Sequence, residues 1–302
     1  MFKRYAFAAA AAVALLFPAG LLAQVSVAER LAPGQPPVIA AQRALGGGFP
    51  ENALAGIQYA LDRGLDMVKI DIQLTRDGQY VVMHDWTLNR TTDVTEIYPD
   101  GAPQGPDRAA SGGKDFVRNY TLDEIRRLRL TDGPEGGDHK VPTLAEALDL
   151  VDGRMLVAIG LKLYEVDSLT AFLEKRDTRN LLFFDIYYAD ARLMHEVIAA
   201  TGIRALVSMS ASKTYLADLE KLADGLGANL AAVVVKRKPL TPDVVARAAD
   251  LGVGLFLSGL TGGEDSALTY RDDPAPWQTT LATDATGFLT AHPDAVMTLL
   301  GR

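Results

Sequence analysis

The sequence predicts an α/β fold, a (β/α)8 barrel of the TIM type with a small insertion after the third strand. Short, nearly continuous apolar segments alternate with helical segments, which is typical of parallel strands covered on both faces. A chain of 302 residues, 48% hydrophobic and 23% charged, is also long enough to bury the core of such a barrel. The pattern gives about nine strand candidates for eight positions. We therefore expect one of the late candidates to be spurious or peripheral.

The elements follow one another in the order that this fold requires. The expected strands are residues 38–43, 67–74, 80–83, 154–162, 181–186, 204–209, 230–235, 253–257 and 287–290. Helical patterns lie between them, notably at 51–63 after Pro50, at 122–130, at 144–151 and around 295–300. A polar stretch rich in Gly and Pro at about 93–119 interrupts the alternation and is the predicted insertion. Loops of this length inside a domain are usually functional.

The strand at 67–74 carries polar side chains on one face. Lys69, Asp71 and Gln73 alternate with apolar residues, and the period of two places them together. The next strand returns after a short turn and ends at His84. In barrels of this type the chemistry lies at the carboxyl ends of the strands. The polar residues that fall late in their strands are Arg43, Asp71, His84 and Lys162.

The first 23 residues have the composition of a secretory signal. Two basic residues precede an apolar run from about Ala6 to Phe17, and a small residue follows at Ala23. The run is too short to span a bilayer comfortably, so we expect cleavage, an exported mature chain of residues 24–302 and no membrane span in it. An uncleaved anchor is the alternative. The chain has no cysteine, which excludes disulfides and a lipid attached at a cysteine.

The charge of the chain argues against nucleic acid as a partner. The net charge is −8, and the sequence has no cluster rich in Lys and Arg. Proteins that bind DNA or RNA usually carry a basic patch. We therefore discount DNA and RNA as partners.

Several short motifs resemble those of glycerophosphodiester phosphodiesterases. In order, they are Ala41 to Arg43, Pro50 to Asn52, Asp71 to Gly78, Val82 to Asp85, Leu88 to Thr92, Pro142 to Leu144, and Leu161 with Lys162. The resemblance is strong from about residue 38 to 162 and weak afterwards, where residues 290–294 resemble a closing motif. It implies a TIM barrel that uses a divalent cation and two histidines to cleave a glycerophosphodiester into an alcohol and glycerol phosphate. The insertion would correspond to the small cap of that family.

The chain departs from this family at three positions of the site. Gln42 stands where the first histidine is expected, and Lys69 and Gly160 stand where two metal-binding glutamates are expected. Arg43, Glu51, Asp71, His84 and Lys162 are retained. A hard cation needs several oxygen ligands, and of the three metal carboxylates only Asp71 remains. We expect no metal cofactor, and Ca²⁺ or Mg²⁺ only if Asp185 or Glu165 supplies the missing ligands.

The residues that remain suggest an anion site with acid and base groups. Arg43, Lys69, Lys162 and Asp71 sum to a charge of +2, and Arg43 offers a planar fork for phosphate. The predicted substrate-binding residues are Arg43, Lys162, Gln42 and Glu51. The predicted catalytic residues are His84, Lys69 and Asp71, with Lys69 replacing the lost histidine because neighbouring cations lower its pKa.

Each of these roles has a structural alternative. Lys69 and Asp71 can form a structural ion pair, His84 can be an ordinary histidine at a strand end, and Glu51 can serve the start of a helix. Three functions remain open. We favour an exported enzyme that acts on a phosphodiester or similar anion by an altered, metal-independent route, by hydrolysis or a lyase-type elimination. The others are ordinary metal-dependent hydrolysis with rescuing ligands, and a non-catalytic protein that binds a phosphorylated ligand.

Overall fold

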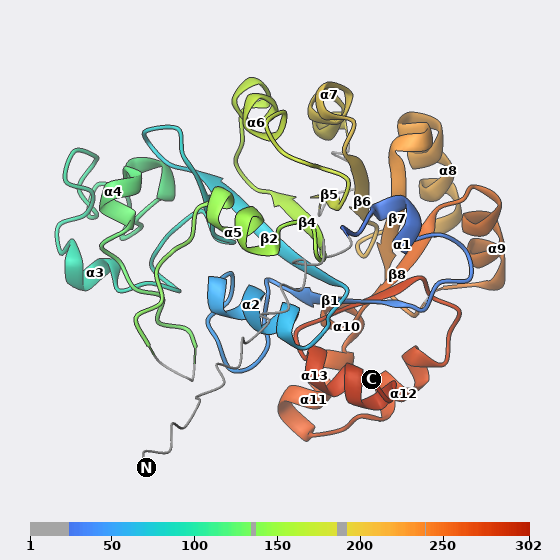
Figure 1. Cartoon of the computed structure of the whole chain (residues 1–302). Helices are drawn as coiled ribbons and strands as arrows, with labels where there is room; N and C mark the ends of the chain where they lie inside the picture. The colour runs from blue at the N-terminus through green and yellow to red at the C-terminus, as the bar shows by residue number, and fades with distance from the viewer. Residues whose placement is uncertain (1–23, 134–136, 186–191, 239) are drawn as a thin grey trace, which may run out of the picture.

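A computed structural model describes residues 24–133, 137–185, 192–238 and 240–302 and confirms the predicted barrel (Figure 1). Eight parallel strands form a closed sheet in the order β1, β2, β4, β5, β6, β7, β8, β9, and β9 pairs with β1 again. Their bounds are β1 (Val38–Gln42), β2 (Met67–Leu74), β4 (Leu156–Leu161), β5 (Leu181–Asp185), β6 (Arg204–Ser208), β7 (Leu230–Val235), β8 (Gly254–Ser258) and β9 (Gly287–Thr290).

The ninth strand is an early one, so the expectation of a spurious late strand was wrong. β3 (Tyr80–Val82) pairs antiparallel with β2, with Leu74 opposite Tyr80, and within the described residues it pairs with no second barrel strand. The five residues between the two strands can close a hairpin, whereas a parallel neighbour requires a crossover of a dozen or more. Every late candidate belongs to the barrel. The hairpin returns the chain to the mouth, where His84 follows β3.

Helices cover the outside of the barrel. They are α2 (Leu54–Asp62), α5 (Leu144–Val151), α6 (Val166–Leu173), α7 (Arg192–Thr201), α8 (Tyr215–Leu226), α9 (Pro242–Asp250), α10 (Gly259–Gly262), α11 (Glu264–Arg271), α12 (Ala275–Leu281) and α13 (Pro293–Leu299). The short helix α1 (Val27–Arg30) instead packs through Val27 against the apolar interior of the barrel. A short helix, η3 (Gly227–Asn229), precedes β7. Apolar side chains of the strands, such as Val68 and Ile70, form the outer core with these helices. The burial of this layer is the main stabilising contribution.

The segment between β3 and β4 forms a compact lobe beside the barrel, on the side toward which β2 extends (Figure 1). It contains α3 (Val94–Ile97), η1 (Val117–Asn119) and α4 (Leu122–Ile125). The lobe has a core of its own, which includes Val94, Tyr120 and Leu128. The Tyr120 hydroxyl donates to buried Asp115 over 2.6 Å. This packing fixes the lobe next to the strand end that carries His84.

The inside of the barrel changes from apolar to polar along the strands. Met67, Ala158 and Phe256 belong to the apolar interior cluster. Farther along, toward the carboxyl ends, Lys69, Asp71 and Gln42 point inward and are buried, as the period of two requires. No helix within the described residues is long and apolar enough to cross a membrane. The predicted signal, residues 1–23, lies outside the described residues.

Candidate active site

Asp71 is the acceptor for two lysines inside the barrel mouth. Its side chain is fully buried, and Oδ1 accepts a hydrogen bond from Lys69 Nζ. Lys162 Nζ, at the end of β4, lies 3.5 Å from the same oxygen. The Phe184 ring lies under Lys69, with its centroid 5.2 Å from Nζ. The ion pair that the sequence left as an alternative therefore forms, and it joins three of the predicted site residues.

The burial of this group shifts both pKa values. Burial lowers the pKa of Lys69 from 10.5 to about 8, with Lys162 and Arg43 acting in the same direction and Asp71 against it. For Asp71 burial acts to raise the pKa, but Lys69, Lys162 and His84 outweigh it and hold the pKa below its usual value. Near neutral pH the carboxylate is therefore charged. Lys69 is an ammonium that can lose its proton at mildly basic pH.

Arg43 and Glu51 come from the loop that follows β1. Arg43 and Ala44 have positive φ angles of 53° and 51°, a conformation that is uncommon outside glycine and clusters at functional sites. The turn is fixed by hydrogen bonds from Asn52 N to Arg43 O (2.7 Å) and from Ala44 N to Lys69 O (3.2 Å). Asn52 Oδ1 also accepts from Asp71 N at 3.3 Å. The loop is thus tied to β2, which places Arg43 beside the lysines.

Glu51 does not serve the start of the helix. α2 begins at Leu54, three residues later than expected, with Ala53 as its N-cap. The Glu51 carboxylate instead accepts from Arg43 Nη1 at 2.9 Å and from both terminal nitrogens of Arg90. Burial acts to raise its pKa, and the two arginines lower it below the usual value. Glu51 is therefore a charged clamp on Arg43.

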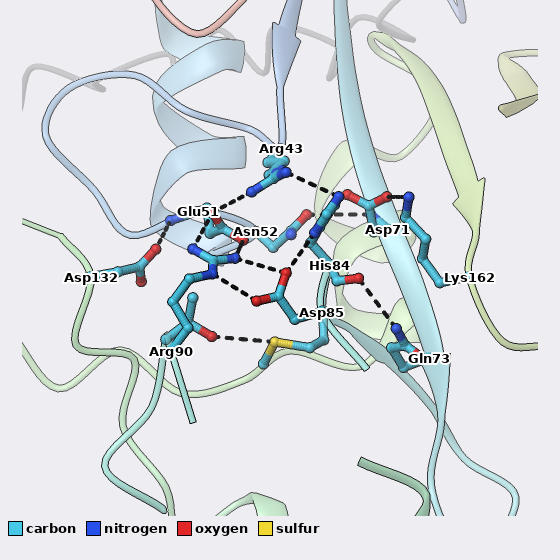
Figure 2. Close-up of polar contacts among 12 residues, drawn as sticks. Arg43, Glu51, Asn52, Asp71, Gln73, His84, Asp85, Arg90, Asp132 and Lys162 are labelled. Carbon is cyan, nitrogen blue, oxygen red and sulfur yellow. Dashed lines mark hydrogen bonds and ion pairs between the residues drawn. The ribbon is translucent and has the colours of Figure 1, made fainter. Parts of the chain in front are cut away.

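His84 is held between an acid and an arginine (Figure 2). Its Nδ1 lies 2.7 Å from Asp85 Oδ1, and its Nε2 lies 3.0 Å from Arg43 Nη2. An ionised carboxylate only accepts and a guanidinium only donates, so the pair of contacts assigns the proton to Nδ1 and leaves Nε2 as acceptor. Burial lowers the pKa of His84, against the influence of Asp71 and Asp85. His84 is thus a neutral base that points at Arg43.

Asp85 and Arg90 are site residues that the sequence reasoning did not select. Arg90 donates to Asp85 through Nε (2.7 Å) and Nη2 (3.1 Å) and also reaches Glu51. The hydrogen bonds from Arg90, with that from His84, lower the pKa of Asp85 to about 2. Both residues lie in the motifs 82–85 and 88–92 that carried the family resemblance, which was the available signal. Asp85 orients His84, and Arg90 holds Asp85 in place.

Three further positions complete the mouth. Gln42 is buried, and its Oε1 has no hydrogen-bond partner among the described residues. Gln73 does not join the lysines, because its amide donates to the His84 carbonyl over 3.3 Å. A Cβ at Gly160 would overlap Asp71 Oδ1. The Asp71 carboxylate therefore fills the space next to Gly160.

The residues present do not fit a divalent cation held in the family's manner. Asp71 is the one carboxylate between the lysines, and the described residues contain no group of three His, Cys, Asp or Glu that could hold a metal. Glu165 is exposed at the N-cap of α6, so it does not supply a ligand inside the mouth. The side chain of Asp185 lies outside the described part of the chain. Absence of a metal cofactor stays a prediction.

The site carries less positive charge than the sequence suggested. Four cations, Arg43, Lys69, Arg90 and Lys162, face three carboxylates, Glu51, Asp71 and Asp85, so the sum is 4 − 3 = +1 rather than +2. Asp132 Oδ2 also lies 3.4 Å from the Glu51 backbone nitrogen, and burial and Glu51 raise its pKa. The positive charge of Arg43 is therefore already balanced by Glu51. The excess positive charge among these side chains lies on Lys69 and Lys162, which share Asp71.

A closed parallel barrel with a buried acid, flanking cations and a strand-end histidine at its mouth defines a TIM-barrel protein with a charged site at the carboxyl ends of its strands. The model of the glycerophosphoryl diester phosphodiesterase family matches residues 43–253. The chain belongs to this family.

Similar proteins agree with this assignment. A glycerophosphodiester phosphodiesterase of Caldanaerobacter subterraneus is 34% identical over 116 residues, which are 37% of this chain and 40% of the relative. Human glycerophosphodiester phosphodiesterase 1 is 38% identical over 99 residues, 33% of this chain and 25% of the relative. The matched region thus spans less than half the length of these relatives. A crystal structure of a glycerophosphoryl diester phosphodiesterase from Parabacteroides distasonis superimposes with a TM-score of 0.70 at 22% identity, covering 93% of each chain.

Proposed function

We propose that this chain is an exported enzyme that cleaves a phosphodiester or a similar anionic substrate by acid and base chemistry without a metal. The observation that carries the proposal is the ordered pair of His84 and Asp85 beside an internal ammonium, Lys69. Lys69 stands where the family has a metal-binding glutamate, and it places a positive charge next to Asp71. In this proposal the ammonium supplies part of the charge that a cation supplies in relatives.

His84 acts as the general base. With Nδ1–H held by Asp85, Nε2 takes a proton from the water that attacks phosphorus. For this, Arg43 must first turn from His84 to the phosphate oxygens, where its fork matches their geometry, and so free Nε2 to accept the proton. Because burial lowers the pKa of His84, the imidazole is neutral at pH 7 and available for this role.

Lys69 acts as the general acid. Its pKa of about 8 keeps it protonated at neutral pH, yet low enough to release the proton. As the bond from phosphorus to the departing oxygen breaks, the ammonium donates a proton to that oxygen. The products are an alcohol and a phosphomonoester such as glycerol phosphate. The same acid and base would also serve a lyase-type elimination.

A binding protein without turnover is the second candidate. The observation that favours it is that both proposed proton-transfer groups are engaged: Lys69 is bonded to Asp71, and His84 Nε2 is bonded to Arg43. Gln42, in the position of the family's first histidine, cannot transfer a proton. Such a site would hold a phosphorylated ligand in place.

Release of glycerol phosphate from glycerophosphocholine or glycerophosphoethanolamine, with and without a chelator, tests the proposal. The metal-independent route gives turnover that survives the chelator, disappears in His84→Ala and persists in the control His195→Ala on α7. Turnover that the chelator abolishes would establish the metal-dependent reaction instead. Binding of glycerol phosphate without turnover of any diester would establish the binding protein. Export is tested separately, by comparing the cellular fraction that holds the full chain with that of residues 24–302.

A further inference from the structure

Basic and apolar side chains gather at one edge of the barrel mouth, away from the residues of the candidate active site. We call this edge the β6–β8 rim, because its residues follow these three strands. They are Lys213, Leu216, Lys236, Arg237, Lys238 and Leu260. In the circular strand order β7 lies opposite β2, so the rim faces Lys69 and Asp71 across the opening.

Hydrogen bonds join the three loops into one surface. The Tyr215 hydroxyl, beside Leu216 at the start of α8, accepts from Lys236 N at 2.9 Å. Thr261, beside Leu260, donates to Ser210 Oγ at 3.1 Å. Arg237 Nε lies 3.5 Å from buried Glu264, at the start of α11. The loops after β6, β7 and β8 are therefore fixed side by side.

The apolar part of the rim is exposed. Leu216 is 42% exposed and Leu260 is 47% exposed, and each is the second residue of a helix that begins at the mouth. Only five large hydrophobic side chains among the described residues are exposed to this degree, and two of them belong to this one surface. Single exposed leucines need no explanation. Two leucines interspersed with cations form an amphipathic surface.

The basic part of the rim contrasts with the rest of the chain. Four cations lie within it, whereas the whole chain has a net charge of −8. Lys213 and Lys238 are exposed, and none of the three lysines is ion-paired within the ranges that the structure describes. Such a separation of charge turns the rim toward a negative surface and the remainder away from it.

We propose that the β6–β8 rim docks the protein on an anionic lipid bilayer, with the barrel mouth toward the lipid. Lysine and arginine side chains are attracted to anionic headgroups, and the leucines enter the boundary between headgroups and acyl chains. A soluble anion would satisfy the cations but gives no role to the leucines. A neutral bilayer would accept the leucines but gives no role to the cations. The proposal concerns a surface and is independent of turnover.

Sedimentation with vesicles tests the proposal. We expect the protein to bind phosphatidylcholine vesicles that contain phosphatidylglycerol, to bind pure phosphatidylcholine far more weakly, and to dissociate in high salt. The variant Lys213→Gln/Lys236→Gln/Lys238→Gln should bind about a hundredfold more weakly, because each basic residue near the surface contributes about fivefold. The control Lys114→Gln/Lys175→Gln/Lys221→Gln removes the same charge from exposed positions outside the rim and should bind as the wild type does.

Tryptophan fluorescence locates the contact. The chain has two tryptophans, exposed Trp86 and fully buried Trp277. In a Trp86→Phe background, Leu260→Trp places a probe on the rim, and Tyr270→Trp places one on α11, where Tyr270 is 81% exposed. Brominated lipids should quench the first probe and leave the second unchanged.

Three results would overturn the proposal. They are absence of binding to anionic vesicles, equal binding by the two triple lysine variants, and equal quenching of the two probes. The last would indicate general adsorption instead of docking by the rim. Each result can be obtained whether or not the protein cleaves a phosphodiester, so failure here is distinct from failure of the proposed reaction.

Discussion

Replacing Lys69 by methionine should change how the stability of the protein depends on pH. The pKa of Lys69 is about 8 in the folded protein and 10.5 in the unfolded chain. Because the folded pKa is the lower one, the ammonium costs stability wherever the folded protein still holds the proton, below about pH 8. Between about pH 8 and 10.5 the unfolded chain binds more protons than the folded protein does, so stability rises with pH in this window.

The size of the effect follows from the shift. A difference of about 2.5 pKa units corresponds to about 3 kcal/mol, at 1.36 kcal/mol for each unit. Methionine has a similar volume and no titratable group, so the stability of Lys69→Met does not show this rise with pH. The difference in unfolding free energy between wild type and variant should therefore move by about 2 to 3 kcal/mol in favour of the wild type between pH 7 and pH 10.

Urea unfolding at the two pH values measures this difference, and the titrating groups that do not interact with Lys69 cancel between the two proteins. Lys114→Met, at an exposed position in the insertion, controls for the loss of one positive charge. A wild-type advantage that stays constant from pH 7 to pH 10 would refute the reasoning. Lys69 would then hold its proton up to about pH 10, too tightly for the role of general acid near neutral pH that we propose.

Further predictions concern metal binding, the ligand, and variants that restore the residues expected from the family at positions 42, 69 and 160. Calorimetry should detect no tight binding of Ca²⁺ or Mg²⁺, since Lys69 and Gly160 replace two carboxylates; micromolar binding that disappears in Asp71→Ala would contradict this. Arg43→Ala should weaken binding of phosphate or glycerol phosphate by about 1.5 to 3 kcal/mol. The loss is smaller if Arg43 must give up its bond to Glu51 when it binds the ligand. An unchanged affinity would show that Arg43 does not bind the phosphate. Gly160→Glu alone should destabilise the fold, because its Cβ overlaps Asp71 Oδ1. The triple variant Gln42→His/Lys69→Glu/Gly160→Glu should regain stability and, with Ca²⁺ or Mg²⁺, release glycerol phosphate faster than wild type; a folded triple variant that binds the cation without any gain on a diester would show that the substrate pocket has also diverged.

The barrel was predictable because the information for it is local. A strand buried on both faces needs a continuous apolar run, and β7 and β9 begin and end at the predicted residues. The run at 80–83 has the same composition, but its place in the fold depends on the length of the preceding turn. Turn length separates a hairpin from a crossover, and composition does not. The misassigned strand, β3, is therefore the one whose position depends on the length of the turn before it.

The candidate site was predictable where side chains belong to one strand. The period of two brought Lys69 and Asp71 together correctly. The clamp of Glu51 on Arg43 and Arg90 depends on two separate loops, the one after β1 and the one after β3, and no periodicity within one segment relates them. The charge sum failed for the same reason, because it omitted Arg90, Glu51 and Asp85.

The differences from the family's motifs at Lys69 and Gly160 depend on each other. A dication requires several carboxylates around it, whereas a single ammonium is balanced by the one carboxylate of Asp71. Asp71 Oδ1 reaches Lys69 by lying where a side chain at position 160 would begin. Glycine there leaves room for the acid next to the lysine, whereas the Cβ of any other residue would overlap Asp71 Oδ1. We therefore expect Lys69→Glu alone and Gly160→Glu alone each to be less stable than both the wild type and the variant that carries the two changes together.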